Sequence, residues 1–172
     1  DKLFKNGFST GHGHLREPND IMSYSALAAI AVQSNQNDQH GGQSIPAFDF
    51  YLAPGVLKTF KKILKTTIKD YIDLEDLNDF INVTSIEKDI AKINTIDITV
   101  DYFEKYYKDS ELMKRMFDMS LKKTLEKTDK RTYQSMEAFV HNLNTMHSRA
   151  GAQVPFSSIN FGTDTSSEGR MV

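Results

Sequence analysis

Two runs of uncharged polar residues and glycines contain most of the side chains that could do chemistry in this 172-residue chain. The first run is residues 34–44 (SNQNDQHGGQS), and the second is residues 142–165 (NLNTMHSRAGAQVPFSSINFGTDT). Amides, hydroxyls, histidines and glycines at this density disfavour both helix and core. We therefore expect a functional site to include these two runs.

The histidines at positions 12 and 14 have a spacing that suits metal binding. On an extended strand, His12 and His14 would place both rings on one face. A third ligand would have to come from Glu17, Asp38 or His40 through folding. Because the sequence has no CxxC, HExxH or EF-hand pattern, we favour hydrogen-bonded loop histidines over a metal site, with nucleotide contact as the other alternative.

Two further patterns are less specific. Gly41 and Gly42 follow a helical pattern and could offer free backbone N–H groups to an anion, but they match neither the Walker motif nor GxGxxG and fit a helix stop as well. Ser157, His147 and Asp164 are the residue types of a catalytic triad, yet the serine lacks a GxSxG setting. We assign no catalytic residue within this chain.

Composition bounds the class of protein. Hydrophobic residues make up 39% and charged residues 26%, which is typical of a globular domain. The net charge of −2 favours neither nucleic acid nor an anionic membrane, and no apolar stretch approaches the roughly 20 residues that span a bilayer, so we expect a cytoplasmic protein. The absence of cysteine excludes disulfides, thiolate metal sites and thiol nucleophiles within these residues. Neither end has a capping or tail-like composition, so we expect an excised fragment.

Hydrophobic spacing predicts a mainly helical chain. Residues 20–33 have apolar residues at helical spacing, with Asp20 available as the N-cap. Residues 48–52 favour a short helix or turn, and Pro54 is suited to begin the next helix, whose pattern continues to residue 73. That helix carries lysines that form either a solvated face or a phosphate-contacting cluster: Lys58, Lys61, Lys62, Lys65 and Lys69.

The rest of the chain predicts further helices and one strand. Residues 74–93 favour one or two shorter helices, the second capped by Thr84 or Ser85. Residues 96–100 fit a strand and a loop equally well. Residues 102–127 and 131–146 predict two helices with apolar stripes, and residues 154–161 predict a strand bounded by glycines.

Three separated phrases of the sequence resemble one enzyme family. GFSTGHGHLREPNDI, SNQNDQHGGQSIPAFDFYLAPGV and AFVHNLNTMHSRAGAQVPFSSINFGTDTS occur in the order found in the anaerobic (class III) ribonucleoside-triphosphate reductases, which are glycyl-radical enzymes. The resemblance implies a fold that is mainly α with a few β-strands, a helix-rich fragment of the family's ten-stranded α/β barrel. It divides the chain into residues 1–60 (effector loop and early barrel helices), 61–130 (a helical segment of variable length) and 131–172 (a helix and a barrel strand).

The resemblance also implies what the parent enzyme does. It reduces ribonucleoside triphosphates to deoxyribonucleoside triphosphates for DNA synthesis, with a glycyl radical installed by an iron–sulfur/S-adenosylmethionine activating enzyme, formate as reductant and a C-terminal structural zinc. It acts as a homodimer regulated by dNTP and ATP effectors. Because the radical residues and the zinc-binding cysteines are not in this chain, we expect the fragment to bind no cofactor and to be inactive. The alternative is a non-catalytic dNTP-binding regulatory or helical interaction module.

By the same resemblance, two groups of residues are candidate nucleotide contacts. The dNTP effector would contact the segment before the first helix together with one lysine: His12, His14, Arg16, Asn19 and Lys62. The substrate would contact the two polar runs, namely Asn37, His40, Gly41, Gly42, Gln43, Ser44, Asn144, His147, Ser157, Ser158 and Asn160.

Overall fold

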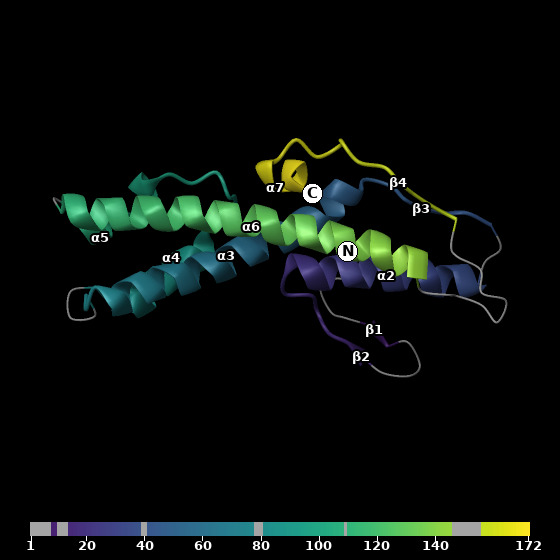
Figure 1. The fold of residues 1–172 in the computed structure, drawn as a ribbon, viewed down its shortest axis with the longest axis horizontal. Coiled ribbons are helices and arrows are strands. Elements are labelled where there is room, and N and C mark those ends of the chain that lie inside the picture. Colours follow the sequence, from purple (N-terminus) through teal and green to yellow (C-terminus); the bar gives the residue numbers. More distant parts are fainter. Residues whose placement is uncertain (1–7, 10–13, 39–40, 78–80, 109, 146–155) are drawn as a thin grey trace. The chain divides into compact units, whose positions relative to one another are not determined.

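The chain forms two compact units of mostly helical structure. A computed structural model describes residues 8–9, 14–38, 41–77, 81–108, 110–145 and 156–172 (Figure 1). Unit 1 comprises Asp1–Val56 and Arg131–Val172, and unit 2 comprises Leu57–Lys130. The boundaries fall inside two long helices, α3 (Phe48–Leu74) and α6 (Glu111–Thr145). The predicted fold class, mainly α with a few strands, is confirmed, while the three-part division based on the resemblance stays a prediction.

In unit 1, helix α2 (Ile21–Asp38) begins after the residue predicted to cap it. The Asp20 carboxylate accepts hydrogen bonds from the backbone N–H of Ser23 at 2.9 Å and from its hydroxyl at 2.7 Å. This satisfies one of the amides that a first helical turn leaves unpaired. The buried face of α2 then joins the first turns of α3 and one ring from α6 in the core of the unit: Ile21, Tyr24, Ala28, Ala29, Phe48, Leu52, Val56 and Phe139.

Glycine at position 55 allows α3 to approach α2 closely. A Cβ atom added at Gly55 would lie 2.9 Å from both Cδ2 and Cγ of Tyr24. Real Cβ contacts are not this short, so any side chain at position 55 would push the Tyr24 ring out of the core. The phrase APGV therefore has a packing role in unit 1.

Two short strands bring the polar runs together. β3 (Gln43–Ile45) pairs in parallel with β4 (Ser157–Ile159), with Gln43 opposite Ser157, Ser44 opposite Ser158 and Ile45 opposite Ile159 (Figure 1). The strand expected over residues 154–161 is confirmed in its central part, and residues 154–155 of that prediction lie outside the described residues. A second, antiparallel pair joins β1 (Phe8–Ser9) to β2 (His14–Leu15), and the short helix α7 (Ser167–Met171) follows β4.

Unit 2 is built from the second part of α3, α4 (Val83–Lys92), the 3₁₀ helix η1 (Val100–Phe103), α5 (Glu104–Tyr107) and the first part of α6. Apolar residues at helical spacing bury one stripe of each longer helix. At its centre the rings of Phe103 and Phe117 stack with centroids 5.0 Å apart. The buried apolar residues include Phe60, Leu64, Ile68, Ile72, Ile86, Ile90, Phe103 and Phe117.

Two expectations about helix ends in unit 1 are wrong. Helix α2 does not end where the polar run begins, since it continues through residues 34–38, where Gln36 is buried and Asn35 bonds to Gln43. Tertiary contacts here outweigh low helix propensity. Pro54 lies inside α3 rather than at its start. Pro54 is on the exposed side of the helix, and burial of Leu52 and Val56 on the other side keeps the helix continuous.

For the middle of the chain, the structure corrects two expectations and decides between the two alternatives of a third. The N-cap of α4 is Asn82, whose side chain accepts the Ser85 N–H at 3.1 Å, rather than Thr84 or Ser85. Residues 96–99 form the loop that the pattern left open as an alternative to a strand. The helices expected over 102–127 and 131–146 are divided differently. A break at Lys108, with φ of 41°, separates α5 from α6, and α6 runs unbroken past residue 130.

Candidate functional site

The parallel pair β3–β4 has one face toward the core and one face toward solvent. Aligned residues of a parallel pair project to the same side of the sheet, and the sides alternate along each strand. Ile45 and Ile159 pack against the core of unit 1, whereas Ser44 and Ser158, one position before them, are exposed. The pair therefore presents polar side chains on the face opposite the helices.

Asn160 extends this exposed face beyond the end of β4. Its backbone N–H donates to the Ile45 carbonyl at 3.0 Å, and its carbonyl accepts from the Phe48 N–H at 2.7 Å. With the backbone held by both bonds, the Asn160 side chain is exposed, two positions after Ser158. We use the name polar face for Ser44, Ser158 and Asn160.

Phe156 is an aromatic neighbour of the polar face that sequence reasoning missed. It lies two positions before Ser158, its ring is 82% exposed, and its carbonyl accepts the Gln43 N–H at 2.8 Å. A Cβ atom at Gly42 would stand 3.0 Å from the Cδ1 atom of this ring. Gly42 thus leaves room for the Phe156 ring. The alternation of residues 156, 158 and 160 along the strand could have suggested that Phe156 lies beside the polar face.

Gln43 and Ser157 are on the other side of the sheet from the polar face. Gln43 is buried, and its side-chain oxygen accepts a hydrogen bond from the Asn35 amide. It borders a mainly apolar cavity of about 470 Å³ between α2, β3 and the start of α3. Among the predicted substrate contacts that the structure describes, Gln43 and Ser44 line this cavity, whereas Ser158 and Asn160 of the polar face do not.

Five predicted substrate contacts remain, and the structure assigns none of them to the polar face. Gly41 has a φ of 112°, a conformation that favours glycine, and is exposed. Asn144 is exposed in the last turn of α6, and Asn37 lies in the last turn of α2. His40 and His147 lie outside the described residues, as does the side chain of Asn37.

Asp49 is a second residue that sequence reasoning missed. It lies in the first turn of α3, is 3% exposed, and accepts hydrogen bonds from Phe50 and from residues 162–164, more than a hundred positions later. Burial alone would raise the pKa of this carboxyl, but the backbone N–H groups of Asp164, Phe50 and Gly162, together with the Thr163 hydroxyl, lower it overall. Asp49 is therefore ionised at neutral pH, and only its position at a helix start hinted at a role.

Two of the predicted effector contacts share a cavity. Arg16 and Asn19 are both exposed and line a cavity of about 330 Å³ together with Glu17, Ser23 and the apolar side of α2. His14 lies in β2, where the structure describes its backbone alone, and His12 lies outside the described residues.

The lysines of α3 separate into different environments. Lys61 donates to the Ala91 carbonyl in the last turn of α4 at 2.9 Å, and burial lowers its pKa. Lys65 pairs with Glu87 at 3.1 Å. Lys62, the predicted effector contact, is exposed on unit 2, whereas Arg16 and Asn19 belong to unit 1. The contact between Lys62 and an effector stays a prediction.

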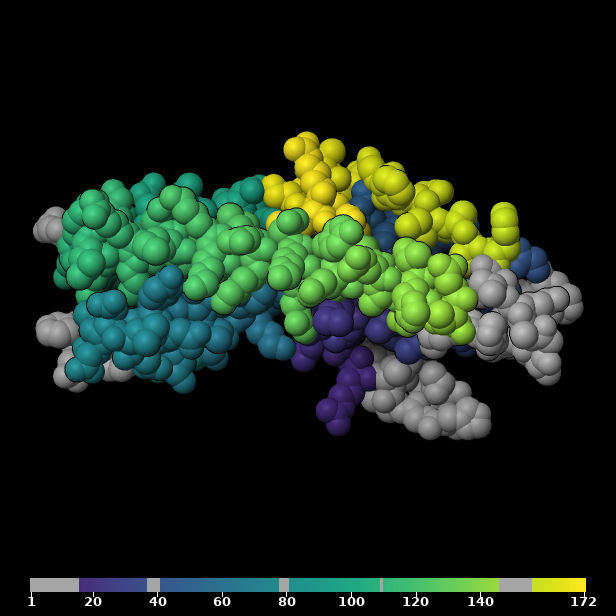
Figure 2. Space-filling view, in the orientation of Figure 1, coloured from purple at the N-terminus to yellow at the C-terminus, as the bar shows by residue number. Residues whose placement is uncertain are grey.

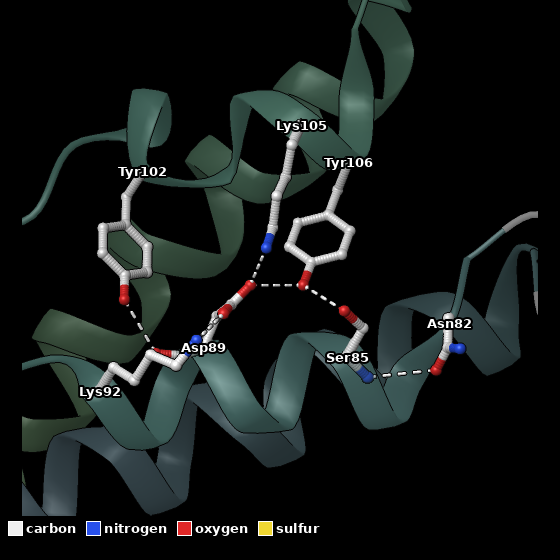
Figure 3. Close-up of polar contacts among 7 residues, drawn as sticks. All are labelled: Asn82, Ser85, Asp89, Lys92, Tyr102, Lys105 and Tyr106. Atoms are coloured by element: carbon white, nitrogen blue, oxygen red, sulfur yellow. Dashed lines mark hydrogen bonds and ion pairs between the residues drawn. The ribbon is translucent and has the colours of Figure 1, made fainter.

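Unit 2 contains a dense polar cluster around a buried carboxylate (Figure 3). Asp89 is 8% exposed and accepts hydrogen bonds from Lys105, from the Tyr106 hydroxyl at 2.6 Å and from Lys92 at 3.0 Å. These three donors, Lys105 first, lower the pKa of Asp89 well below its usual range. The Tyr102 hydroxyl donates to the Asp89 carbonyl at 2.9 Å, which ties η1 as well as α5 to α4.

The chain has no thiol, and the described residues offer no metal site. The whole sequence lacks cysteine. Within the part of the chain that the structure describes, no group of three or more histidine, aspartate or glutamate side chains could hold a metal ion. Four of the ligands considered from the sequence are not covered by this search, because His12 and His40 fall outside that part and the side chains of His14 and Asp38 are not described. No helix among the described residues is long and apolar enough to cross a membrane.

A parallel strand pair with helices on one face and polar residues on the other has the layout of an α/β barrel wall. A comparison with protein families agrees with an α/β barrel protein. The family described as anaerobic ribonucleoside-triphosphate reductase matches residues 1–172, so the chain belongs to this family and is a helix-rich part of its barrel. Membership implies glycyl-radical chemistry, a nucleotide substrate and a radical-SAM activating enzyme for the parent protein. No curated protein matches the chain.

Proposed function

We propose that this chain is the part of an anaerobic ribonucleoside-triphosphate reductase whose polar face binds the ribonucleoside triphosphate that the enzyme converts to a deoxyribonucleoside triphosphate. The observation that supports this most is the alternation on β3 and β4, where Ile45 and Ile159 pack on helices while Ser44, Ser158 and Asn160 face away from them. In a barrel, the face opposite the helices is the interior. That is where a substrate would be enclosed.

The chemistry of the polar face suits a ribose and its phosphates. Two hydroxyls and a primary amide can donate and accept hydrogen bonds without carrying charge. Their side chains make no hydrogen bond to another described residue, in contrast to the bonded backbone of Asn160. A neutral, hydrogen-bonding surface can orient a nucleotide without offering a side chain that would itself react with the radical.

We propose that these residues bind and orient the substrate and do not react with it. The chain supplies no thiol, and no group of side chains in its described part could hold a structural zinc ion. The isolated 172-residue chain is therefore expected to show no reduction of ribonucleoside triphosphates. Formate as reductant and regulation of a homodimer by dNTP and ATP belong to the same proposal for the parent enzyme.

For the effector, we propose that the cavity beside Arg16 and Asn19 accepts part of a deoxynucleoside triphosphate. A guanidinium can bind phosphate oxygens with two parallel hydrogen bonds, and Asn19 adds a neutral donor at the same cavity. His12, His14 and Lys62 are further contacts in this proposal.

The substrate proposal is tested by Asn160→Ala in the complete, activated reductase. We expect KM for the ribonucleoside triphosphate to rise about 10-fold, since a hydrogen bond to a polar substrate contributes roughly 1.4 kcal/mol. Radical content, measured by electron paramagnetic resonance, should be unchanged. The matched control is Asn94→Ala, an exposed asparagine of unit 2, which should leave KM as it is. An unchanged KM in Asn160→Ala would exclude Asn160 from the substrate site.

A further inference from the structure

The carboxylate of Asp49 connects the start of α3 to the segment that follows the polar face. We propose that Asp49 is a positioning residue for substrate binding, which holds Asn160 in place through residues 162–164 without touching the substrate. This inference rests on the proposed function of the polar face. It concerns a residue that neither the sequence patterns nor family membership assigned.

Both oxygens of Asp49 are used, and most of their bonds go to residues 162–164. Oδ2 accepts the Gly162 N–H at 2.6 Å and the Asp164 N–H at 3.0 Å. Oδ1 accepts the Thr163 hydroxyl at 3.2 Å and the Phe50 N–H at 2.9 Å. To stabilise the start of α3, Asp49 would need only its bond to Phe50 and an exposed negative charge. The other three bonds therefore act on residues 162–164.

The backbone of residues 162–164 is shaped to reach this carboxylate. Gly162 has a φ of 91°, which a residue with a side chain rarely adopts. This turn allows two backbone N–H groups, from Gly162 and Asp164, to converge on one oxygen. Residues 160–163, between β4 and α7, are exposed on unit 1 (Figure 2), so bonds to a buried partner are needed to hold them.

Asn160 lies between two attachments. On one side its backbone bonds to Ile45 and Phe48. On the other side, two residues later, Gly162 is bonded to Asp49. Asp49 directly follows Phe48, so both attachments lead to the first turn of α3. Loss of the carboxylate would release the segment just after Asn160 while leaving the β3–β4 pairing intact.

The segment is also packed tightly on its far side. The Asp164 carboxylate accepts the Ser166 N–H at 2.8 Å, and the Ser166 hydroxyl oxygen accepts the Gly169 N–H at 3.0 Å. A Cβ atom at Gly169 would lie 2.6 Å from the Asp164 Cγ atom. Asp49 therefore holds one end of a continuous set of contacts that runs from α3 to α7, with the polar face directly before it.

The test is Asp49→Asn in the complete, activated reductase, with Asp118→Asn as the matched control. Asp118 is a half-exposed residue of α6 that pairs with Lys122. Asparagine keeps the shape of Asp49 but turns an acceptor oxygen into a donor that faces N–H groups. We expect KM for the ribonucleoside triphosphate to rise about 10-fold with radical content unchanged, because small displacements of binding groups cost about this much or more. The control should leave KM unchanged.

The split between KM and kcat separates positioning from folding. A purely structural loss would lower the amount of active enzyme, and hence kcat, at unchanged KM. That result would overturn the inference. If Asp49→Asn does not fold, Thr163→Val is tested in its place, since it removes one of the four bonds to Asp49. We then expect KM to rise about 2-fold. No rise in that variant would equally overturn it.

Failure of this inference can be told apart from failure of the proposed function. If Asn160→Ala raises KM and Asp49→Asn does not, the polar face binds substrate but Asp49 does not position it. If neither raises KM, the polar face itself is not the substrate site. If both raise KM, the fold-rise in the double variant should be smaller than the product of the two single fold-rises, because both changes act on one side chain.

Discussion

Unit 1 and unit 2 both contain concentrated polar residues, but they use them in opposite ways. In unit 2, Asp89 is surrounded by the side chains of Lys92, Lys105 and Tyr106, so its hydrogen-bonding capacity is used within the unit. In unit 1, the polar face keeps its backbone bonded and leaves its side chains exposed. A polar cluster thus indicates binding only where the side chains are not already bonded to each other.

The same contrast holds for the two buried aspartates. Asp89 joins elements of unit 2 that are close in sequence, namely α4, η1 and α5. Asp49 joins the start of α3 to residues 162–164. The first stabilises a local fold, whereas the second links the segment after the first polar run to the end of the second polar run. Three substitutions would test the contrast between the two units, from the largest expected effect on stability to the smallest.

Removal of the buried carboxylate of unit 2 should have the largest effect. Asp89→Ala leaves Lys105, Lys92 and Tyr106 without their shared acceptor, and we expect the midpoint of thermal unfolding to fall by about 10 °C. Circular dichroism at 222 nm on the 172-residue chain would measure it. A fall of less than about 2 °C would mean that the cluster of Figure 3 is not structural.

The effect of Asp89 should also depend on pH in a defined direction. Its folded pKa lies below the ordinary value of 3.8, so its contribution to stability is present above that value and is lost as the pH falls toward the folded pKa. The difference in midpoint between the wild type and Asp89→Ala should therefore be constant near neutral pH and shrink below pH 3.8. Comparing the two proteins cancels Asp49, whose lowered pKa acts in the same direction.

In unit 1, packing rather than charge should determine stability. Gly55→Ala places a Cβ atom 2.9 Å from the Tyr24 ring, and we expect a loss of roughly 1–3 kcal/mol, or about 5 °C in the unfolding midpoint. The sign is informative, because glycine to alanine within a helix ordinarily stabilises by about 0.5–1 kcal/mol. Tyr24→Leu combined with Gly55→Ala should recover part of the loss. A stabilised single variant would contradict the close approach of α2 and α3.

The exposed side chains of the polar face should have the smallest effect on stability. Ser158→Ala should change the free energy of unfolding by less than about 0.5 kcal/mol, because the side chain is exposed and the strand keeps its backbone bonds. Denaturant unfolding of the 172-residue chain would measure it. A loss comparable to that of Asp89→Ala would remove the contrast between the two units, since Ser158 would then be part of the structure rather than of a binding surface.

Much of the local structure was predictable because its causes are local. Apolar residues at helical spacing predicted the longer helices, Asp20 was recognised as a cap from its place before α2, and residues 154–161 were expected to form a strand. Errors arose where distant contacts decide. Pro54 stays within α3 because the helix is buried on its other side, and residues 34–38 stay helical because of contacts made by Asn35 and Gln36.

The sequence predicted which residue types make up the candidate site, but not which side of the sheet each residue faces. Ser44 and Gln43 are neighbours of similar polarity, yet one is exposed and the other buried, because the strand alternates and Ile45 must reach the core. The register between β3 and β4 decides which of these residues face the same side as Ser158. No local pattern contains that register.

The sequence by itself determined the family, the helical character of the chain and the absence of thiol chemistry within it, since each depends on residue identity or on spacing along the chain. Only the tertiary structure decided which polar residues share a face and which support it. Asp49 shows the reason most clearly, because its partners lie more than a hundred positions away and become neighbours only when β3 and β4 pair.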